Sequence, residues 1–517
     1  MAIVRATTSN FHWQARSLEI LTLAAFGALF FLVPDGTDPW VLIANLGTFY
    51  VVFLRALAVP DRILPWLPSY FSIEVLFLAY SYLIFYYPYQ LSLFGIGDIS
   101  VSRYLIDSYV DGSNKAITLT TVGMLAFVIG YRVLGGATGD VEAAQMTPSV
   151  ERPAQEQLRA RYFRAMSTAS SMLLVALIAL YVAAGWRTAG EGRYTGTTSG
   201  GLGIEGISIV IMMLCMIVAA LWVYAAASKL AKPTILVFGF VVTVGWTLRW
   251  LVLGDRNSFL LVALIFVGGY CTFVRRTSLA MVAVAFAIWM FVYSIVEVVR
   301  TVPNWYRAGN IWDLFEMARN FQDSSNESSF NVTTIALRAT VETVPYAHDF
   351  AYGSFKVVQF FSAVPFSGRF YLPYLNPEYQ SSADLLSDII LGPRATWGTG
   401  TNVISDSYVD FGMPGVVAIL FCIGLFAKMI RNYVARDPQD AHRVIAYLLT
   451  MSMFAQLPRY AIEIPIRVLT WAVVFSVIVR VFARRGHART SARHTGSARG
   501  SRSRPNAAAS ERRRLLL

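Results

Sequence analysis

Residues 398–426, GTGTNVISDSYVDFGMPGVVAILFCIGLF, decide the fold class of this chain. The second part opens an apolar run, 411–430, that is long enough to cross a bilayer. The first part closes a long polar stretch, 300–411, between two groups of such runs. Loops of that length among spans are usually functional, so we expect the chemistry of the protein to lie in 300–411.

Composition gives the same class, because 56% of the 517 residues are hydrophobic and only 14% are charged. An apolar helix needs about 20 residues to cross about 30 Å of hydrocarbon. We count about 12 candidate runs: 18–33, 40–59, 70–87, 116–133, 165–184, 207–227, 235–253, 259–274, 279–299, 411–430, 444–456 and 464–481. The sequence therefore predicts an all-α integral membrane protein with about 12 transmembrane helices.

Lys and Arg set the expected orientation, since cytoplasmic loops retain these residues. With the N-terminus inside, the basic clusters of the short loops all fall inside. Both termini are then cytoplasmic, and 300–411 is a large extracytoplasmic loop. We expect four parts: a membrane bundle of about nine helices, 1–299, the loop, 300–411, further membrane helices, 412–483, and a disordered basic tail, 484–517.

Several classes of function are disfavoured by the sequence. Much of the net charge of +12 lies in the tail, which suits anionic membrane lipid rather than nucleic acid. The three cysteines, Cys215, Cys271 and Cys422, lie in expected spans and form no disulfide or metal spacing. No zinc-protease or P-loop motif occurs, so no metal and no cofactor are expected.

Arginines recur at expected span ends on the outer side, where the positive-inside rule makes them least expected. They are Arg256 in LGDRNSF, Arg300, Arg369 in VPFSGRFY, Arg394 in LGPRATWGTG and Arg459 in QLPRYAIE. A guanidinium matches phosphate oxygens and keeps its charge, so this set suits a membrane-bound pyrophosphate. Each Arg could instead reach the headgroups or pair with a neighbour such as Asp255 or Glu463.

The loop also contains short helical patterns. IWDLFEMARNF, 311–321, and FKVVQFFSAV, 355–364, have apolar residues at helical spacing, which predicts short helices at the membrane interface. Aromatic residues crowd the same loop. Most of these rings suit anchoring at headgroup depth, and a minority could stack on sugar rings.

These residues resemble the Wzy-type O-antigen and oligosaccharide repeat-unit polymerases. The resemblance rests on GDRNS at 254–258, on VPFSGRFYLP at 364–373, on GTGTNVISDSYVDFGMPGVV at 398–417 and on Arg459. It is clearest over 246–480. The chain departs from the family pattern at Asp406, where Glu is usual, and at Arg369, which does not directly follow Pro365.

The resemblance implies a GT-C-like, metal-independent glycosyltransferase in the bacterial cytoplasmic (inner) membrane. It would extend an O-antigen, capsule or exopolysaccharide from undecaprenyl-type polyprenyl-diphosphate-linked oligosaccharides. A chain-length regulator and a flippase are the implied partners. For substrate binding we expect Arg256, Arg369, Arg394 and Arg459 at the diphosphates, with Arg300, Lys356 and Tyr408 as further candidates. Asp406 is the expected base and His348 the second candidate.

Alternatives remain at this point. Asp406 could act as a helix cap or dipole partner, and His348 could be an ordinary loop histidine. An O-antigen ligase would use the same donor, whereas other polyprenyl-linked GT-C enzymes would place paired acidic residues on a long first outer loop. A lipid-linked oligosaccharide flippase or transporter would show two similar halves, which this sequence lacks.

Overall fold

The computed structural model describes most of the chain. The described residues are 2–96, 98–99, 109–134, 153–186, 202–253, 255–284, 286–288, 310, 312–313, 316, 329–364, 367, 379, 381–393 and 398–500. Within them the regular secondary structure is helical apart from one antiparallel hairpin, β1 (Asp61–Leu64) and β2 (Leu67–Ser69). The all-α class predicted from the sequence is confirmed.

Eight helices among the described residues are long and apolar enough to cross a membrane. They are α2 (Pro39–Ala58), α5 (Ser113–Val133), α7 (Pro153–Ala183), α8 (Leu202–Ala227), α9 (Thr234–Val252), α10 (Arg256–Phe273), α17 (Val403–Ala435) and α19 (Glu463–Gly500). Each overlaps one expected run. Helix α19 extends beyond its expected run as far as Gly500, and the disordered tail stays a prediction.

The other four expected runs do not form helices of this length and apolar character among the described residues. Two fall in α1 (Ala2–Leu32), whose apolar part is the shorter Ser17–Leu32, and in α18 (Ala441–Gln456). Run 279–299 lies largely outside the described residues. Run 70–87 is divided, as described next. The count of about 12 spans therefore stays a prediction.

The expected run 70–87 is split into α3 (Ile73–Ser81), the π-helical segment η1 (Tyr82–Tyr86) and α4 (Tyr87–Leu93). Pro88 cannot donate a backbone hydrogen bond, so a regular α-helix cannot pass through it without loss. Just before Pro88, the N–H of Tyr87 donates to the carbonyl of Tyr82, which is one residue further back than the acceptor in an α-helix. Proline thus explains why this run is not one continuous helix.

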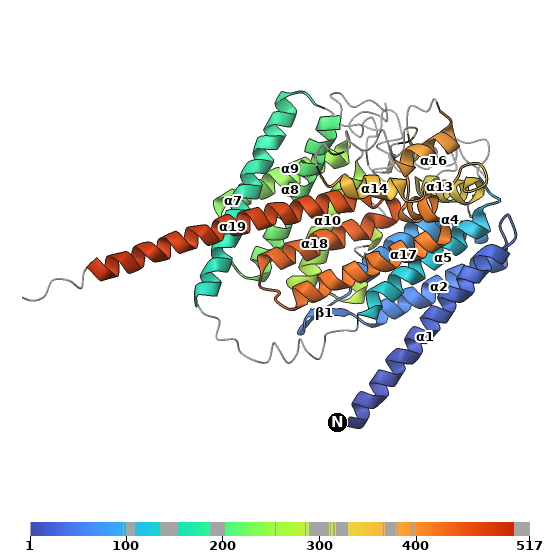
Figure 1. Cartoon of the computed structure of the whole chain (residues 1–517), viewed down its shortest axis with the longest axis horizontal. Helices are drawn as coiled ribbons and strands as arrows, with labels where there is room; N and C mark the ends of the chain where they lie inside the picture. The colour runs from blue at the N-terminus through green and yellow to red at the C-terminus, as the bar shows by residue number, and fades with distance from the viewer. Residues whose placement is uncertain are drawn as a thin grey trace, which may run out of the picture.

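Helix α17 packs along α5 at the centre of the bundle (Figure 1). The two backbones meet at glycines from both sides. A Cβ at Gly424 would lie 2.0 Å from the carbonyl oxygen of Phe127, and one at Gly130 would lie 2.1 Å from that of Phe421. Only glycine permits this approach, which is how helices pack closely when hydrocarbon surrounds them.

The remaining helices lie where α17 begins. They are α13 (Ser329–Thr343), α14 (Ser354–Phe361), α16 (Ser382–Leu391) and the 3₁₀ turn η4 (Leu457–Arg459), and each contacts α17. Figure 1 shows α13, α14 and α16 gathered at that end of the bundle. The helix predicted in 355–364 is confirmed as α14, whereas most of the helix predicted in 311–321 lies outside the described residues.

Buried ion pairs hold the opposite end of the bundle. Arg132 of α5 pairs with Glu19 at 2.5 Å and with Glu74 at 2.7 Å, which ties α1 and α3 to α5. Arg431, near the end of α17, pairs with Asp61 of the β-hairpin at 2.8 Å. Charges buried in this way need partners, so the pairs fix which helices meet there.

Replacing Gly424 by valine should destabilise the protein, because the new side chain would overlap the α5 backbone. We expect a loss on the order of 1–3 kcal/mol or more, measured as a fall in melting temperature of the purified protein in detergent. Gly245→Val in α9 is the control, since a Cβ there meets nothing within 4 Å. Equal melting temperatures for the two variants would contradict the close α5–α17 contact.

Candidate active site

Helix α17 is made of two pieces. Its N-terminus is capped by the side chain of Asn402, which accepts from the N–H groups of Ile404 (3.1 Å) and Ser405 (2.8 Å). Asp406 is therefore not the cap. The helix is interrupted at Gly412, which has φ 65° and ψ −159° and precedes Pro414 by two residues. A short first piece thus carries the acidic residues, and the apolar second piece forms the span.

Lys356 of α14 lies between the two aspartates of that first piece. Its Nζ lies 2.9 Å from Asp406 Oδ2 and 3.0 Å from Asp410 Oδ2, and it donates to the carbonyl oxygen of Asp406 at 2.7 Å. Both carboxylates are fully buried. An ammonium shared by two carboxylates in this way fixes α14 against α17.

Each carboxylate also has neutral donors. Oδ1 of Asp406 accepts from Gln359 Nε2 and from Ser382 Oγ, both at 2.6 Å, which adds α16 to the cluster. Oδ1 of Asp410 accepts from the backbone N–H groups of Gly353 (3.1 Å) and Phe355 (3.3 Å), where α14 begins. We call Lys356, Gln359, Ser382, Asp406 and Asp410 the polar cluster.

The surroundings of the polar cluster are acidic. Glu463, the first residue of α19, pairs with Arg467, and the carboxylates of Asp406 and Asp384 act on it electrostatically. Among the described residues named here, carboxylates therefore outnumber cations. Such a field suits sugar hydroxyls and opposes a diphosphate, so a diphosphate needs other cations.

Aromatic rings border the polar cluster. Tyr408, on the first piece of α17, has its ring 6.1 Å from that of Phe30 in α1 and 6.0 Å from that of Phe350. Phe350 in turn lies 6.3 Å from Tyr352, beside the start of α14. Tyr408 is buried, so in this structure it positions neighbouring rings rather than presenting an open stacking surface.

Two of the predicted arginines are described, and they lie at helix ends that meet. Arg256 begins α10 and is 3% exposed, and Arg459 ends η4. The side chain of Gln456, just before η4, donates to the carbonyl of Asn257 at 3.0 Å, which joins these two ends. Asp255 caps α10 by accepting from Ser258.

Of the four candidate residues not yet placed, the structure describes only His348. Arg300, Arg369 and Arg394 lie outside the described residues. His348 is half-buried, and its backbone N–H donates to the carbonyl of Thr343. In the described part of the chain, no group of acidic, His and Cys side chains could hold a metal ion.

Sequence reasoning missed Asp410, Gln359, Ser382 and Arg467. The spacing of Asp406 and Asp410 was a usable signal, because residues four apart share one face of a helix. It also missed Arg338 of α13, which is fully buried and donates to the carbonyl of Ile99 at 3.0 Å. Burial lowers the pKa of Arg338, although Tyr89 and Glu342 act in the opposite direction.

Replacing Lys356 by methionine should destabilise the fold, because it leaves two buried carboxylates without their cation. We expect a loss of about 3–5 kcal/mol in the free energy of unfolding, seen as a lower melting temperature in detergent. Adding Asp406→Asn and Asp410→Asn to this variant should restore part of the loss. Lys229→Met, at an exposed lysine, is the control. An unchanged melting temperature in Lys356→Met would contradict the ion pairs.

The chain was compared with known proteins. The model of the family "O-antigen polysaccharide polymerase Wzy" matches residues 67–486, which is most of the chain and extends well before the stretch 246–480 that carries the resemblance. No curated protein and no solved structure matched. The match confirms the resemblance inferred from the motifs, and the chain belongs to the Wzy family of O-antigen polysaccharide polymerases.

Proposed function

We propose that this membrane protein joins polyprenyl-diphosphate-linked repeat units into a surface polysaccharide by glycosyl transfer on the extracytoplasmic face. Family membership supports a repeat-unit polymerase in general. The observation that carries the finer proposal is the buried polar cluster, which α14, α16 and α17 assemble around Lys356. Buried ionisable groups in a membrane protein are generally functional.

In the proposed reaction, a hydroxyl of the acceptor sugar attacks the anomeric carbon of the donor glycan. The new C–O bond forms while the bond from that carbon to the diphosphate breaks. The hydroxyl proton passes to a base, and the polyprenyl diphosphate leaves with the bonding electrons. We assign the base to Asp406, with His348 as the second candidate.

The geometry sets a condition on Asp406. Its Oδ1 already accepts from Ser382 and Gln359, and its Oδ2 faces Lys356. An acceptor hydroxyl must therefore replace one of the neutral donors before Asp406 can take its proton. Ser382 is the simpler one to replace, because its hydroxyl can rotate toward another acceptor.

The diphosphate needs cations that the acidic cluster does not supply. We assign this role to Arg256 and Arg459, which lie near helix ends that a hydrogen bond from Gln456 to Asn257 links, and to Arg369 and Arg394, with Arg300 as a further candidate. Fixed guanidinium groups can stabilise a departing diphosphate electrostatically, so the proposed GT-C-like reaction requires no metal. Lys356 and Tyr408 are assigned to positioning around the acceptor.

We also propose where in the cell the protein acts and with which partners. We place the protein in the bacterial inner membrane with both termini in the cytoplasm, since the basic loops then all lie inside. The substrates are undecaprenyl-type lipid-linked oligosaccharides, and the polymer is an O-antigen, capsule or exopolysaccharide. A flippase would supply the repeat units, and a chain-length regulator would act on the product.

Deletion of this chain from its host tests the function. We expect single lipid-linked repeats to accumulate, with at most one repeat on the final acceptor, when glycans are separated by gel and mass spectrometry. Long polymer that remains lipid-linked would instead identify a ligase. Undiminished normal polymer would overturn the polymerase proposal and favour the transporter.

Substitution of single residues tests the assignments. In membranes supplied with lipid-linked repeats, Arg256→Ala and Arg459→Ala should each lower the rate of polymer formation by about 10²–10³-fold, the typical cost of one stabilising donor. Asp406→Asn should lower it by roughly 10²–10⁴-fold without preventing donor binding. Arg276→Ala, at an exposed arginine in the loop after α10, is the control. Full activity of Asp406→Asn would remove the assigned base.

A further inference from the structure

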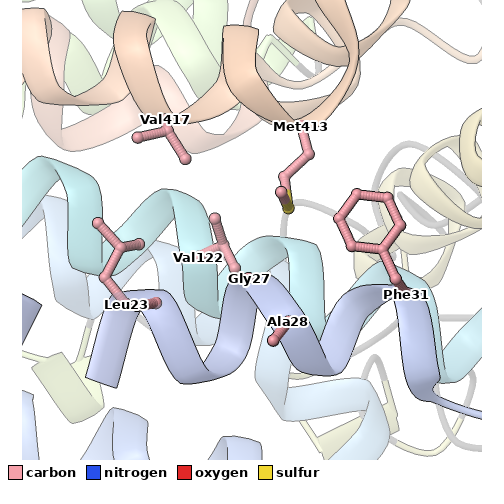
Figure 2. Close-up of a pocket in the computed structure, with 8 residues that line it drawn as sticks. Leu23, Gly27, Ala28, Phe31, Val122, Met413 and Val417 are labelled. Atoms are coloured by element: carbon pink, nitrogen blue, oxygen red, sulfur yellow. The ribbon is translucent and has the colours of Figure 1, made fainter. Parts of the chain in front are cut away.

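A cavity of about 330 Å³ lies between α1, α5 and α17 (Figure 2). All eight residues that line it are apolar: Leu23, Ala24, Gly27, Ala28, Phe31, Val122, Met413 and Val417. In Figure 2, Met413 and Val417 project from α17 toward α1. No lining residue can neutralise a phosphate or bind a sugar hydroxyl, so only a hydrocarbon fits the cavity.

Small residues on α1 create the hollow. Ala24, Gly27 and Ala28 share one face of that helix, and a Cβ at Gly27 would still lie 3.9 Å from Met413 Cε. The surrounding surface is apolar and open, since Leu21 is 66% exposed and Phe31 is 70% exposed. In a membrane protein this surface meets lipid hydrocarbon, so the cavity can be entered sideways from the bilayer.

The cavity and the polar cluster lie next to each other along α17. Met413 directly follows the interruption at Gly412, and Asp410 lies on the other side of it. Aromatic side chains also link the cavity to the first piece of α17. Phe31, which lines the cavity, packs against Phe30 at 5.3 Å between ring centres, and Phe30 packs against Tyr408 on the first piece of α17.

We propose that this cavity holds part of the isoprenoid tail of the polyprenyl-linked substrate, so that the sugars of that substrate are held near the polar cluster. The inference rests on the proposed function, because only a lipid-linked substrate needs a tail site beside the reacting groups. A volume of about 330 Å³ is at the lower end of the roughly 300–1,000 Å³ typical of ligand pockets, and it suits a segment of the tail nearest the head rather than its full length. A membrane phospholipid has no comparable reason to prefer this position over the rest of the apolar surface.

Photo-crosslinking tests the tail site. The probe is a sugar-free polyprenyl diphosphate that carries a benzophenone on its isoprenoid chain, added to the full-length protein in nanodiscs. We expect mass spectrometry to find the label on α1 and on α17 near Met413. Unlabelled lipid-linked repeats should displace the probe, whereas phosphatidylglycerol should not. Labelling that phosphatidylglycerol displaces equally well would overturn the proposal and leave a site for ordinary lipid.

Filling the cavity gives a second readout. Gly27→Leu should reduce labelling about tenfold or more, the effect of excluding roughly two methylene groups from contact. Gly245→Leu, on the exposed face of α9, adds the same side chain where a Cβ meets nothing within 4 Å, and it should leave labelling unchanged. Equal labelling of the two variants would overturn the tail site.

The labelling result is independent of the reaction. If labelling maps elsewhere while Asp406→Asn and Arg459→Ala still abolish polymer, the tail site fails and the polymerase stands. If Gly27→Leu loses the label but the deletion strain makes normal polymer, the cavity binds a polyprenyl lipid and the polymerase proposal fails.

Discussion

The close packing of α17 on α5 is the contact on which the rest of the structure depends. Gly130 and Gly424 let the two backbones touch, which sets the position of α17 along its whole length. Helix α17 then supplies Asp406 and Asp410 to the polar cluster on one side of Gly412 and Met413 to the apolar cavity on the other. A shift of α17 would disturb both regions together, because they share one helix.

Helix α14 has the distribution of side chains that a membrane environment favours. Its polar residues Lys356 and Gln359 point inward and are buried, whereas Phe360 and Phe361 are 61% and 52% exposed. In water this arrangement would be unfavourable, but next to hydrocarbon the polar groups must be satisfied inside the protein. The position of α14 therefore supports a site that lies at the edge of the bilayer, where a lipid-linked substrate would present its head group.

The distribution of charge is the reason for proposing separate binding places for the acceptor and for the diphosphate. Within the described part of the chain, the polar cluster and its neighbours hold more carboxylates than cations, which suits activation of an acceptor hydroxyl and disfavours a diphosphate. Arg256 and Arg459 belong to different helices, and a hydrogen bond from Gln456 to the carbonyl of Asn257 links the ends near which they lie. Separate places for the acceptor and for the leaving group are what a transfer between two lipid-linked substrates requires.

The sequence by itself determined the all-α membrane class, the helix in 355–364 and the family, since hydropathy and short motifs are local properties of the chain. It also indicated Asp406 and Lys356 as functional candidates without linking them. Tertiary structure alone decided that Lys356, Asp406, Asp410 and Ser382 meet, because these contacts join residues that are far apart in sequence. It also decided the cavity beside Gly27, since that cavity depends on how three helices pack.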